Sequence, residues 1–317
     1  MRYDAPSDAG ARPYPPSYTE FFLDSNHAWV ARTYSSATSC FDHVSVFVTS
    51  DGGWTWDESA PISAAVQLDT YMQLQLAFID PQHGWMLVLG GGRIAPDWFV
   101  YSTADGGRHW KLVSQLPIMS STCGMTFISQ TTGFLGGCRN SSGRTATLTV
   151  TRDGGKTWNN MQLPEQSGNS FSVLSTAFFE SRGFAWVGGQ TFEGNTSTSG
   201  SYLVATSDTG KSWQMLPGLP AGYPVTFHFL DPNNFWILTT EAKVAAQALY
   251  KSSDGGNTWT LLTRDLPVLM YSPQVIFIDQ RTGFILQSTF QLPQGGLELL
   301  VTTDGGRTWK DVHPQIS

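Results

Sequence analysis

An eight-residue motif that recurs six times constrains the fold of this chain more than any other feature. It has the form Ser/Thr-x-Asp-x-Gly-x-x-Trp, and its successive aspartates are 46 to 55 residues apart. A fixed period of this size is typical of repeat architectures, in which each repeat is one supersecondary unit that buries its apolar face against the next. The six copies occupy residues 49–56, 103–110, 151–158, 206–213, 252–259 and 302–309.

The residue types of the motif predict a structural turn. Aspartate can accept hydrogen bonds from turn amides, glycine can adopt a positive φ, and tryptophan can pack a large apolar face against a sheet. We therefore expect these residues to stabilise the repeat and not to act in catalysis. They are Asp51, Asp105, Asp153, Asp208, Asp254 and Asp304, with Trp56, Trp110, Trp158, Trp213, Trp259 and Trp309.

A second motif lies upstream of each copy of the first. A phenylalanine is followed seven residues later by an aromatic residue, across a segment that contains turn-forming residues such as Asp, Pro, Asn and Gly. This spacing indicates a β-hairpin. The pairs are Phe22/Trp29, Phe78/Trp85, Phe127/Phe134, Phe179/Trp186, Phe229/Trp236 and Phe277/Phe284.

Together the motifs predict four antiparallel strands per repeat, A to D, with the Asp motif at the C–D turn. Charged residues make up only 14% of the chain, which fits many short strands joined by turns. The expected fold is all-β, a six-bladed β-propeller of four-stranded antiparallel blades, with a seven-bladed ring as the alternative. The expected repeats are 18–62, 71–117, 122–164, 173–217, 224–267 and 273–314, within a single domain over 18–317. Residues 1–17 are expected to tether the chain or to close the ring.

These repeats resemble the Asp-box, or bacterial neuraminidase repeat. That repeat occurs in sialidases, xyloglucan-degrading propellers, sortilin-type receptors and the photosystem II assembly factor family. The F-x-D-x-x-x-G-W hairpin followed by a D-G-G-x-T-W box is most similar to the assembly-factor propellers. The resemblance covers nearly the whole chain, from about Tyr18 to Val312, and implies the fold; proteins of this kind usually have seven blades, whereas this chain has six boxes.

Composition excludes several classes of partner. The net charge of −7 is spread along the chain without a basic cluster, so no nucleic-acid partner is expected. No stretch approaches the ~20 apolar residues of a membrane span, and none is expected. Residues 1–17 are polar and proline-rich, without the apolar core of a signal peptide. The sequence leaves open whether a leader was removed, and a monomer without cofactor or metal is expected.

The positions of two of the three cysteines bear on the cellular compartment of the protein. With the third hairpin centred between Gln130 and Thr131, Cys123 on strand A lies opposite Cys138 on strand B. A cross-strand disulfide between them would favour an extracytoplasmic location, secreted, periplasmic or surface-tethered. The alternative is a pair of reduced cysteines.

A ligand site is expected on the face that carries the B–C and D–A loops, because loops on a rigid scaffold carry function. The B–C loops are predicted at 33–43, 90–98, 137–146, 189–201, 240–248 and 288–298. Arg32, Arg93 and Arg139 fall at or after the ends of strands B in three consecutive blades and could grip an anion, as sialidase arginines do. The alternative is that they are solvated loop arginines.

Acids for glycosidase chemistry are few once the boxes are set aside. Asp97 beside Trp98 suits a sugar ring on an aromatic platform, and Glu20 and Glu193 are further catalytic candidates. Gln75 and Gln274 near the ends of inner strands could hydrogen-bond a ligand or line a wet channel. The alternative for Asp97 and Trp98 is an ordinary loop acid next to a residue that opens a strand.

The complete scaffold and incomplete catalytic set favour an extracytoplasmic, non-catalytic binding or assembly propeller. It would present its B–C and D–A loop face to a protein or glycan partner. The alternative is a carbohydrate-active enzyme, a sialidase-like glycosidase or a polysaccharide lyase, with its site at the central opening. The sequence leaves open whether the chain is an enzyme.

Overall fold

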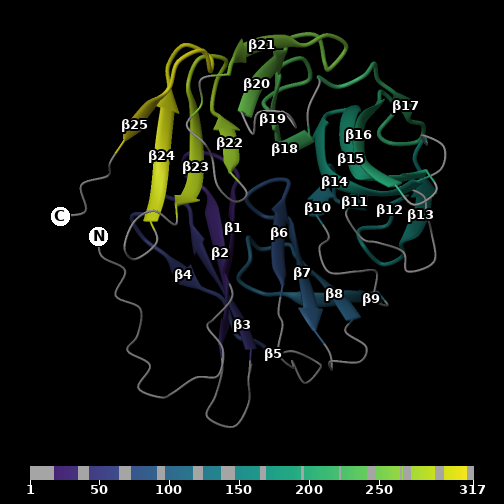
Figure 1. Cartoon of the computed structure of the whole chain (residues 1–317). Coiled ribbons are helices and arrows are strands. Elements are labelled where there is room, and N and C mark those ends of the chain that lie inside the picture. The colour runs from purple at the N-terminus through teal and green to yellow at the C-terminus, as the bar shows by residue number, and fades with distance from the viewer. Residues whose placement is uncertain are drawn as a thin grey trace. The chain divides into compact units, whose positions relative to one another are not determined.

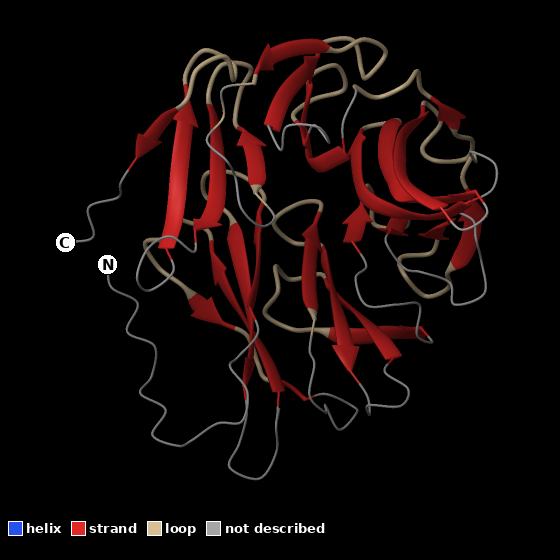
Figure 2. Cartoon of the chain, in the orientation of Figure 1, coloured by secondary structure: helices blue, strands red, loops and turns tan. Residues whose placement is uncertain are grey.

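The computed structural model of the chain describes residues 18–34, 43–63, 73–90, 97–116, 124–136, 147–164, 169–193, 196–220, 223–240, 247–264, 266, 273–289 and 296–312. All regular structure in these residues is β-strand (Figures 1 and 2). No membrane-spanning helix is found in this described part of the chain. By its contacts the chain divides into two compact units, Met1–Ser141 with Leu148–Met161, and Ser142–Thr147 with Gln162–Ser317.

The first unit holds three antiparallel sheets. In sheet 1 the outermost strand is split into two short pieces, β4 and β5, which both pair with β3. The strands are β1 (Tyr18–Phe22), β2 (Ala28–Tyr34), β3 (His43–Thr49), β4 (Asp57–Glu58) and β5 (Ile62–Ser63) in sheet 1; β6 (Leu74–Phe78), β7 (Gly84–Gly90), β8 (Asp97–Thr103) and β9 (Lys111–Leu116) in sheet 2; and β10 (Gly124–Phe127), β11 (Gly133–Gly136), β12 (Thr147–Thr151) and β13 (Asn159–Gln162) in sheet 3.

The second unit also holds three antiparallel sheets, each of four strands. Its strands are β14 (Asn169–Phe179), β15 (Arg182–Glu193), β16 (Thr196–Thr206) and β17 (Gln214–Met215) in sheet 4; β18 (Tyr223–Phe229), β19 (Phe235–Thr240), β20 (Gln247–Ser252) and β21 (Thr260–Thr263) in sheet 5; and β22 (Gln274–Phe277), β23 (Gly283–Thr289), β24 (Gly296–Thr302) and β25 (Lys310–Val312) in sheet 6.

The strands of each sheet follow one another in chain order as an antiparallel meander. The predicted all-β fold, a β-propeller of six four-stranded antiparallel blades, is confirmed. The single domain over 18–317 stays a prediction. The predicted role of residues 1–17 concerns residues outside the described part of the chain.

The A–B turn and the Asp-box turn of each sheet lie side by side at one end, here called the box end; the opposite end is the loop end. The N–H at the fourth position of each box donates to a carbonyl of the A–B turn, as Gly106 does to Gln82 at 2.9 Å. Gly106 has a φ of +75°, and a Cβ there would come 2.8 Å from the Pro81 carbonyl oxygen. In this box, glycine is therefore required at residue 106 by both backbone conformation and space.

Neighbouring sheets of one unit are joined by a contact of three aromatic rings. Trp29 of β2 stacks on Phe78 of β6, with ring centroids 3.7 Å apart and planes at 9°. Trp110 of the second box meets Phe78 edge-on, at 6.0 Å and 84°. The indole N–H of Trp29 also donates to the Gly106 carbonyl at 2.8 Å. Each such contact buries apolar area and satisfies a polar group of the box.

The same contact recurs at two other sheet boundaries. The indole N–H of Trp85 donates to the Gly154 carbonyl at 3.0 Å, and that of Trp236 to the Gly305 carbonyl at 3.2 Å. The ring sets are Trp85, Phe127 and Trp158 between sheets 2 and 3, and Trp236, Phe277 and Trp309 between sheets 5 and 6.

The glycine that opens strand B makes room for the phenylalanine of this contact. A Cβ built at Gly84 would overlap the ring of Phe78. The same overlap occurs for three other pairs, Gly133 with Phe127, Gly183 with Phe178, and Gly283 with Phe277. In sheet 5, Phe235 takes the place of this glycine, and Phe227 meets the box residue Trp259 edge-on at 5.7 Å.

The predicted fourth aromatic pair, Phe179/Trp186, is wrong. In the ladder Phe178 lies opposite Gly183, as Phe78 lies opposite Gly84, so the equivalent pair is Phe178 and Phe184. The cause is an A–B turn one residue shorter than in sheet 2, with Glu180 at a φ of +55°. The shorter turn accompanies the one box whose fourth residue is not glycine, where Thr209 has a φ of +62°.

The predicted loop at 189–201 is also wrong, because most of it is strand. The β15–β16 ladder runs through eleven pairs, from Gly183 opposite Thr206 to Glu193 opposite Thr196. In sheets 1, 2 and 6 the corresponding ladder has seven pairs. Residues 190–193 and 196–199, here called the sheet-4 extension, therefore continue the sheet at its loop end by four pairs. The strands β14, β15 and β16 are strongly curved (Figure 1).

Replacing Gly84 by alanine is expected to destabilise the protein by about 1–3 kcal/mol, because the new methyl group enters the space of the Phe78 ring. Gly124→Ala is the matched control, since a Cβ at Gly124 meets nothing within 4 Å. Denaturant unfolding of both variants measures the difference. Equal stabilities would show that the strand-B glycine is not required by packing.

Trp85→Phe is expected to cost about 1–2 kcal/mol more than Trp98→Phe. Both changes shrink a buried indole, but only Trp85 donates its N–H, to the Gly154 carbonyl. Trp98 Nε1 has no hydrogen-bond partner among the described residues. Chemical denaturation of the pair isolates the indole–carbonyl bond, and equal losses of stability would argue that this bond contributes nothing.

Candidate functional site

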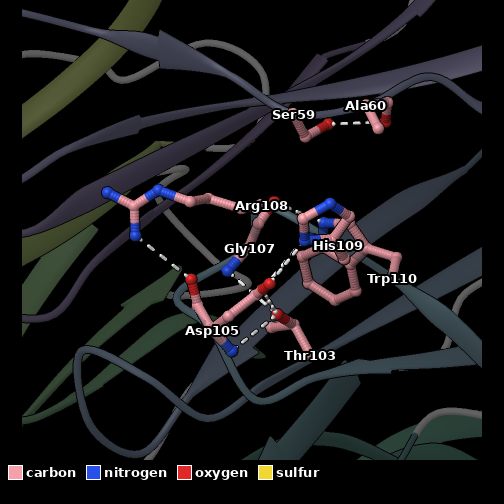
Figure 3. Close-up of polar contacts among 8 residues, drawn as sticks. All are labelled: Ser59, Ala60, Thr103, Asp105, Gly107, Arg108, His109 and Trp110. Atoms are coloured by element: carbon pink, nitrogen blue, oxygen red, sulfur yellow. Dashed lines mark hydrogen bonds and ion pairs between the residues drawn. The ribbon is translucent and has the colours of Figure 1, made fainter.

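The box end of each sheet is occupied by its own hydrogen bonds, as the second box illustrates (Figure 3). The Thr103 hydroxyl donates to Asp105 Oδ1 at 2.9 Å and accepts the N–H of Gly107 at 2.9 Å. The backbone N–H of His109 donates to Asp105 Oδ1 at 3.0 Å, and its Nδ1 lies 2.6 Å from Asp105 Oδ2. Trp110 donates its indole N–H to the Gly107 carbonyl at 2.9 Å. Both carboxylate oxygens of Asp105 are thus used inside the turn.

The other five boxes repeat the hydrogen bonds to the aspartate with a hydroxyl in place of the His109 ring, whereas the indole–carbonyl bond recurs for Trp56, Trp158 and Trp309. Thr55, Thr157, Ser212, Thr258 and Thr308 each donate to the second oxygen of their box aspartate at 2.6 Å. The bonds from Thr55 lower the pKa of Asp51 to about 2, and those from Thr157 lower the pKa of Asp153 to about 2. Burial raises the pKa of Asp105, but the bonds from His109 and Thr103 outweigh it and lower the pKa to about 2.

The A–B turns use aspartate in the same way. Asp80 Oδ1 accepts the N–H groups of Gln82 and His83, both at 2.8 Å. Among the described residues, every carboxyl group with a shifted pKa belongs to an A–B turn or a box, and every one of these pKa values is lowered. They are Asp24, Asp51, Asp80, Asp105, Asp153, Asp208, Asp231, Asp254, Asp279 and Asp304. A general acid at neutral pH needs the opposite shift.

Of the three predicted arginines, Arg32 alone lies in the described part of the chain; Arg93 and Arg139 lie outside it. Arg32 is 4% exposed, and its guanidinium carbon lies 5.6 Å from the ring centroid of Tyr18 and 4.7 Å from that of Tyr34. It lines a cavity of about 320 Å³ together with Tyr18, Val30, Phe47 and Trp56. Aromatic packing therefore holds this guanidinium on the face of sheet 1.

Asp97 and Trp98 do not form an open sugar platform in this structure. Trp98 is 1% exposed and packs in the core of sheets 2 and 3, since the second residue of β8 points inward. Asp97, the first residue of β8, accepts a hydrogen bond from Gln115 Nε2 at 2.5 Å. Glu20 is exposed in the middle of β1, and Glu193 is the last residue of β15. These candidates lie on three different sheets.

The two glutamines have different surroundings. Gln75 Oε1 accepts the backbone N–H of Met125 at 2.8 Å and so links sheets 2 and 3. Gln274 is exposed at the start of β22.

The disulfide prediction falls on Cys123 and Cys138, which lie outside the described residues. The described part of their hairpin is centred on Gln130, half a residue from the predicted centre, because Gly124 lies opposite Gly136. No cluster of three or more His, Cys, Asp or Glu side chains that could hold a metal ion occurs in the described ranges.

The sheet-4 extension gives the loop end strand backbone beyond the length of the ladders in sheets 1, 2 and 6. Most predicted B–C loop residues lie outside the described part of the chain, and the sheet-4 extension is the longest described element there. Sequence reasoning missed it, although the pair Gly194-Asn195 between strand-forming residues is a two-residue hairpin signal.

Comparison with known proteins gives a family and a fold. The profile of the family described as photosynthesis system II assembly factor YCF48 matches residues 107–266. The photosystem II assembly lipoprotein Ycf48 of Synechococcus sp. (strain CC9902) is 26% identical over 165 residues, which are 49% of this chain and 40% of that protein. The chain therefore spans two fifths of the length of this relative.

Two solved structures show the same fold. The GH74 xyloglucanase of Xanthomonas campestris superposes with a TM-score of 0.57 at 15% identity, covering 92% of this chain and 45% of that one. The α-L-arabinofuranosidase Arb93A of Fusarium graminearum gives a TM-score of 0.54 at 13% identity, covering 90% and 92%. At these identities the likeness concerns the fold alone.

The lowered pKa values predict how stability depends on pH. The ordinary pKa of Asp153 is 3.8 and its folded value is about 2. Its contribution is therefore complete above about pH 4 and is lost as the pH falls through about 2. We expect the melting temperature to fall between pH 4 and pH 2, and to fall less in Thr157→Val, which removes the hydroxyl bond to Asp153. Identical pH profiles for the two proteins would contradict a stabilising role of this bond.

Proposed function

The chain belongs to the family of photosynthesis system II assembly factor YCF48, and from this premise we propose that it is a non-catalytic assembly propeller that holds a protein partner. The observation that carries the proposal is the family match over residues 107–266, which runs from the second box past the end of sheet 5. The Synechococcus relative is itself an assembly lipoprotein by name. A partner in this role is a polypeptide that has not yet reached its final complex.

The chemistry of the carboxyl groups supports a binding role over a catalytic one. Glycoside hydrolysis requires two carboxyl groups that flank one bond, one of them protonated at working pH. The described carboxyl groups with shifted pKa values are held ionised in turns, as Asp51 and Asp153 are by Thr55 and Thr157. Such groups stabilise the scaffold and are not available as proton donors.

We place the partner at the loop end of the sheets. The box end is filled by hydrogen bonds within the turns, whereas the loop end carries the segments that differ most between repeats. Segments of this kind on a repeated scaffold are the usual carriers of specificity. The name of the lipoprotein relative supports an extracytoplasmic location for this chain as well. In this role the chain acts as a monomer that binds one partner.

The alternative function is a carbohydrate-active enzyme. The arabinofuranosidase that shares this fold belongs to that class, and it and this chain overlap over nearly their whole lengths. In this reading Arg93 and Asp97 would be the residues that act on the sugar. The Asp97 carboxylate accepts a hydrogen bond from the side-chain amide of Gln115, which is neutral.

Photo-crosslinking in the host cell tests the location of the partner. A photoreactive residue at Asp97 or Tyr34, at the loop ends of β8 and β2, is expected to capture one protein, identified by mass spectrometry. The controls are Trp54, which is 75% exposed, and Lys211, both in box turns. Capture from Trp54 and Lys211 instead would contradict a loop-end site.

A turnover screen separates the two functions. The purified protein is expected to cleave none of a panel of sialosides, xyloglucan, arabinan and uronic-acid oligosaccharides. Turnover that is lost in an Arg93→Ala/Asp97→Ala variant would replace the assembly role by the enzymatic one.

A further inference from the structure

In sheet 4 the third strand extends past the fourth at the loop end by more residues than in sheets 2, 5 and 6. β16 spans Thr196–Thr206, but β17 pairs only with Val204 and Ala205. Residues 196–201 pair with β15 on one side, through the ladder that ends with Glu193 opposite Thr196. No described strand pairs with residues 196–201 on the other side. Within the described residues, sheet 4 therefore ends in an open backbone edge six residues long.

The direction of the backbone groups along this edge follows from one printed contact. The Leu203 carbonyl accepts the N–H of Leu216 at 2.9 Å, so Leu203 directs its backbone groups away from β15. Successive residues of an antiparallel strand alternate in this direction. The ladder between β15 and β16 has no register shift, so Ser201, Ser199 and Ser197 direct their N–H and C=O groups to the same open side.

This edge lacks the devices that usually protect an edge strand. Proteins blunt such edges with charged residues, proline, bulges or very short strands. Residues 196–201 read Thr-Ser-Thr-Ser-Gly-Ser, without a charge or a proline. The segment belongs to a three-stranded part of the sheet, because β15 pairs with β14 on its other side as far as Asn169 opposite Thr191. Three paired strands give the edge the rigidity that a template needs.

We propose that the open edge of β16 binds an extended segment of the partner polypeptide, which adds to sheet 4 as a further strand. The inference rests on the proposed assembly function and specifies how the partner is held. Strand addition suits a protein that is not yet assembled, because its segments are extended and their backbone groups are unpaired. Affinity comes from main-chain hydrogen bonds, so the site recognises the extended backbone of the bound segment more than any particular side chain of that segment.

The test removes one outward N–H without changing the sheet. Ser199→Pro deletes the N–H that points to the open side, and proline is tolerated in an edge strand when its missing N–H faces outward. Ser199→Ala is the matched control, because it keeps the N–H. Circular dichroism and melting temperature establish that both variants are folded. Peptides selected from a phage-displayed library of random 12-residue sequences serve as the probe.

The expected result is at least tenfold weaker peptide binding by Ser199→Pro and unchanged binding by Ser199→Ala. In the selected peptide, N-methylation of the backbone is expected to abolish binding to the wild-type protein at every second residue only. This pattern needs no variant and keeps the inference testable if Ser199→Pro fails to fold. No selected peptide, equal binding by all proteins, or the absence of a two-residue period would overturn the inference. Self-association that Ser199→Pro abolishes would assign the edge to a second copy and would also overturn it.

Co-purification from the host separates this inference from the proposed function. A partner that is retained equally by the wild type and by Ser199→Pro would refute the open edge as its site and leave the assembly role standing. If the wild-type protein retains no partner, the assembly role fails, whatever the peptides show.

Discussion

The structure depends on the contact between the aromatic residue at the second position of strand B and the Asp-box turn of the next sheet. The stack of Trp85 on Phe127 brings the indole N–H to the Gly154 carbonyl, which is positioned by the hydrogen bonds that Asp153 accepts. A four-stranded sheet cannot bury both faces alone, so this contact converts isolated hairpins into packed blades. The carboxylate, the glycines and the tryptophan of the motif thus all stabilise this contact between neighbouring sheets.

The box motif allowed the six-bladed fold to be predicted because each of its residue types has one mechanical role. Prediction of the aromatic pairs failed in sheet 4, where a turn of different length changed the strand register. The turn at Glu180 is one residue shorter, which moved the aromatic pair from Phe179 and Trp186 to Phe178 and Phe184. The extension of sheet 4 was missed because Ser and Gly, which are typical of turns and loops, make up four of residues 196–201, and only the pairing with β15 makes this segment a strand.

The candidate site was harder to predict than the fold, because the sequence does not tell which polar residues the packing consumes. Trp98 and Gln75 belong to the join between sheets 2 and 3, and Arg32 is held between two tyrosines. The groups that the described structure offers for binding are those of the strand backbone at the loop end. A scaffold whose box and A–B turn aspartates are fixed in turns, and whose elongated sheet has an open edge within the described residues, suits a protein that holds another polypeptide.

Hydrogen exchange of the purified protein, alone and with its co-purified partner, tests this division between a structural box end and a binding loop end most directly. The box amides, such as those of Gly107 and Gly155, already donate to Thr103 and Thr151, so their exchange is expected to be slow and unchanged. The amides of Ser197, Ser199 and Ser201, which point to the open side, are expected to become protected when the partner binds. New protection confined to the box turns, with none at the loop end, would contradict the account.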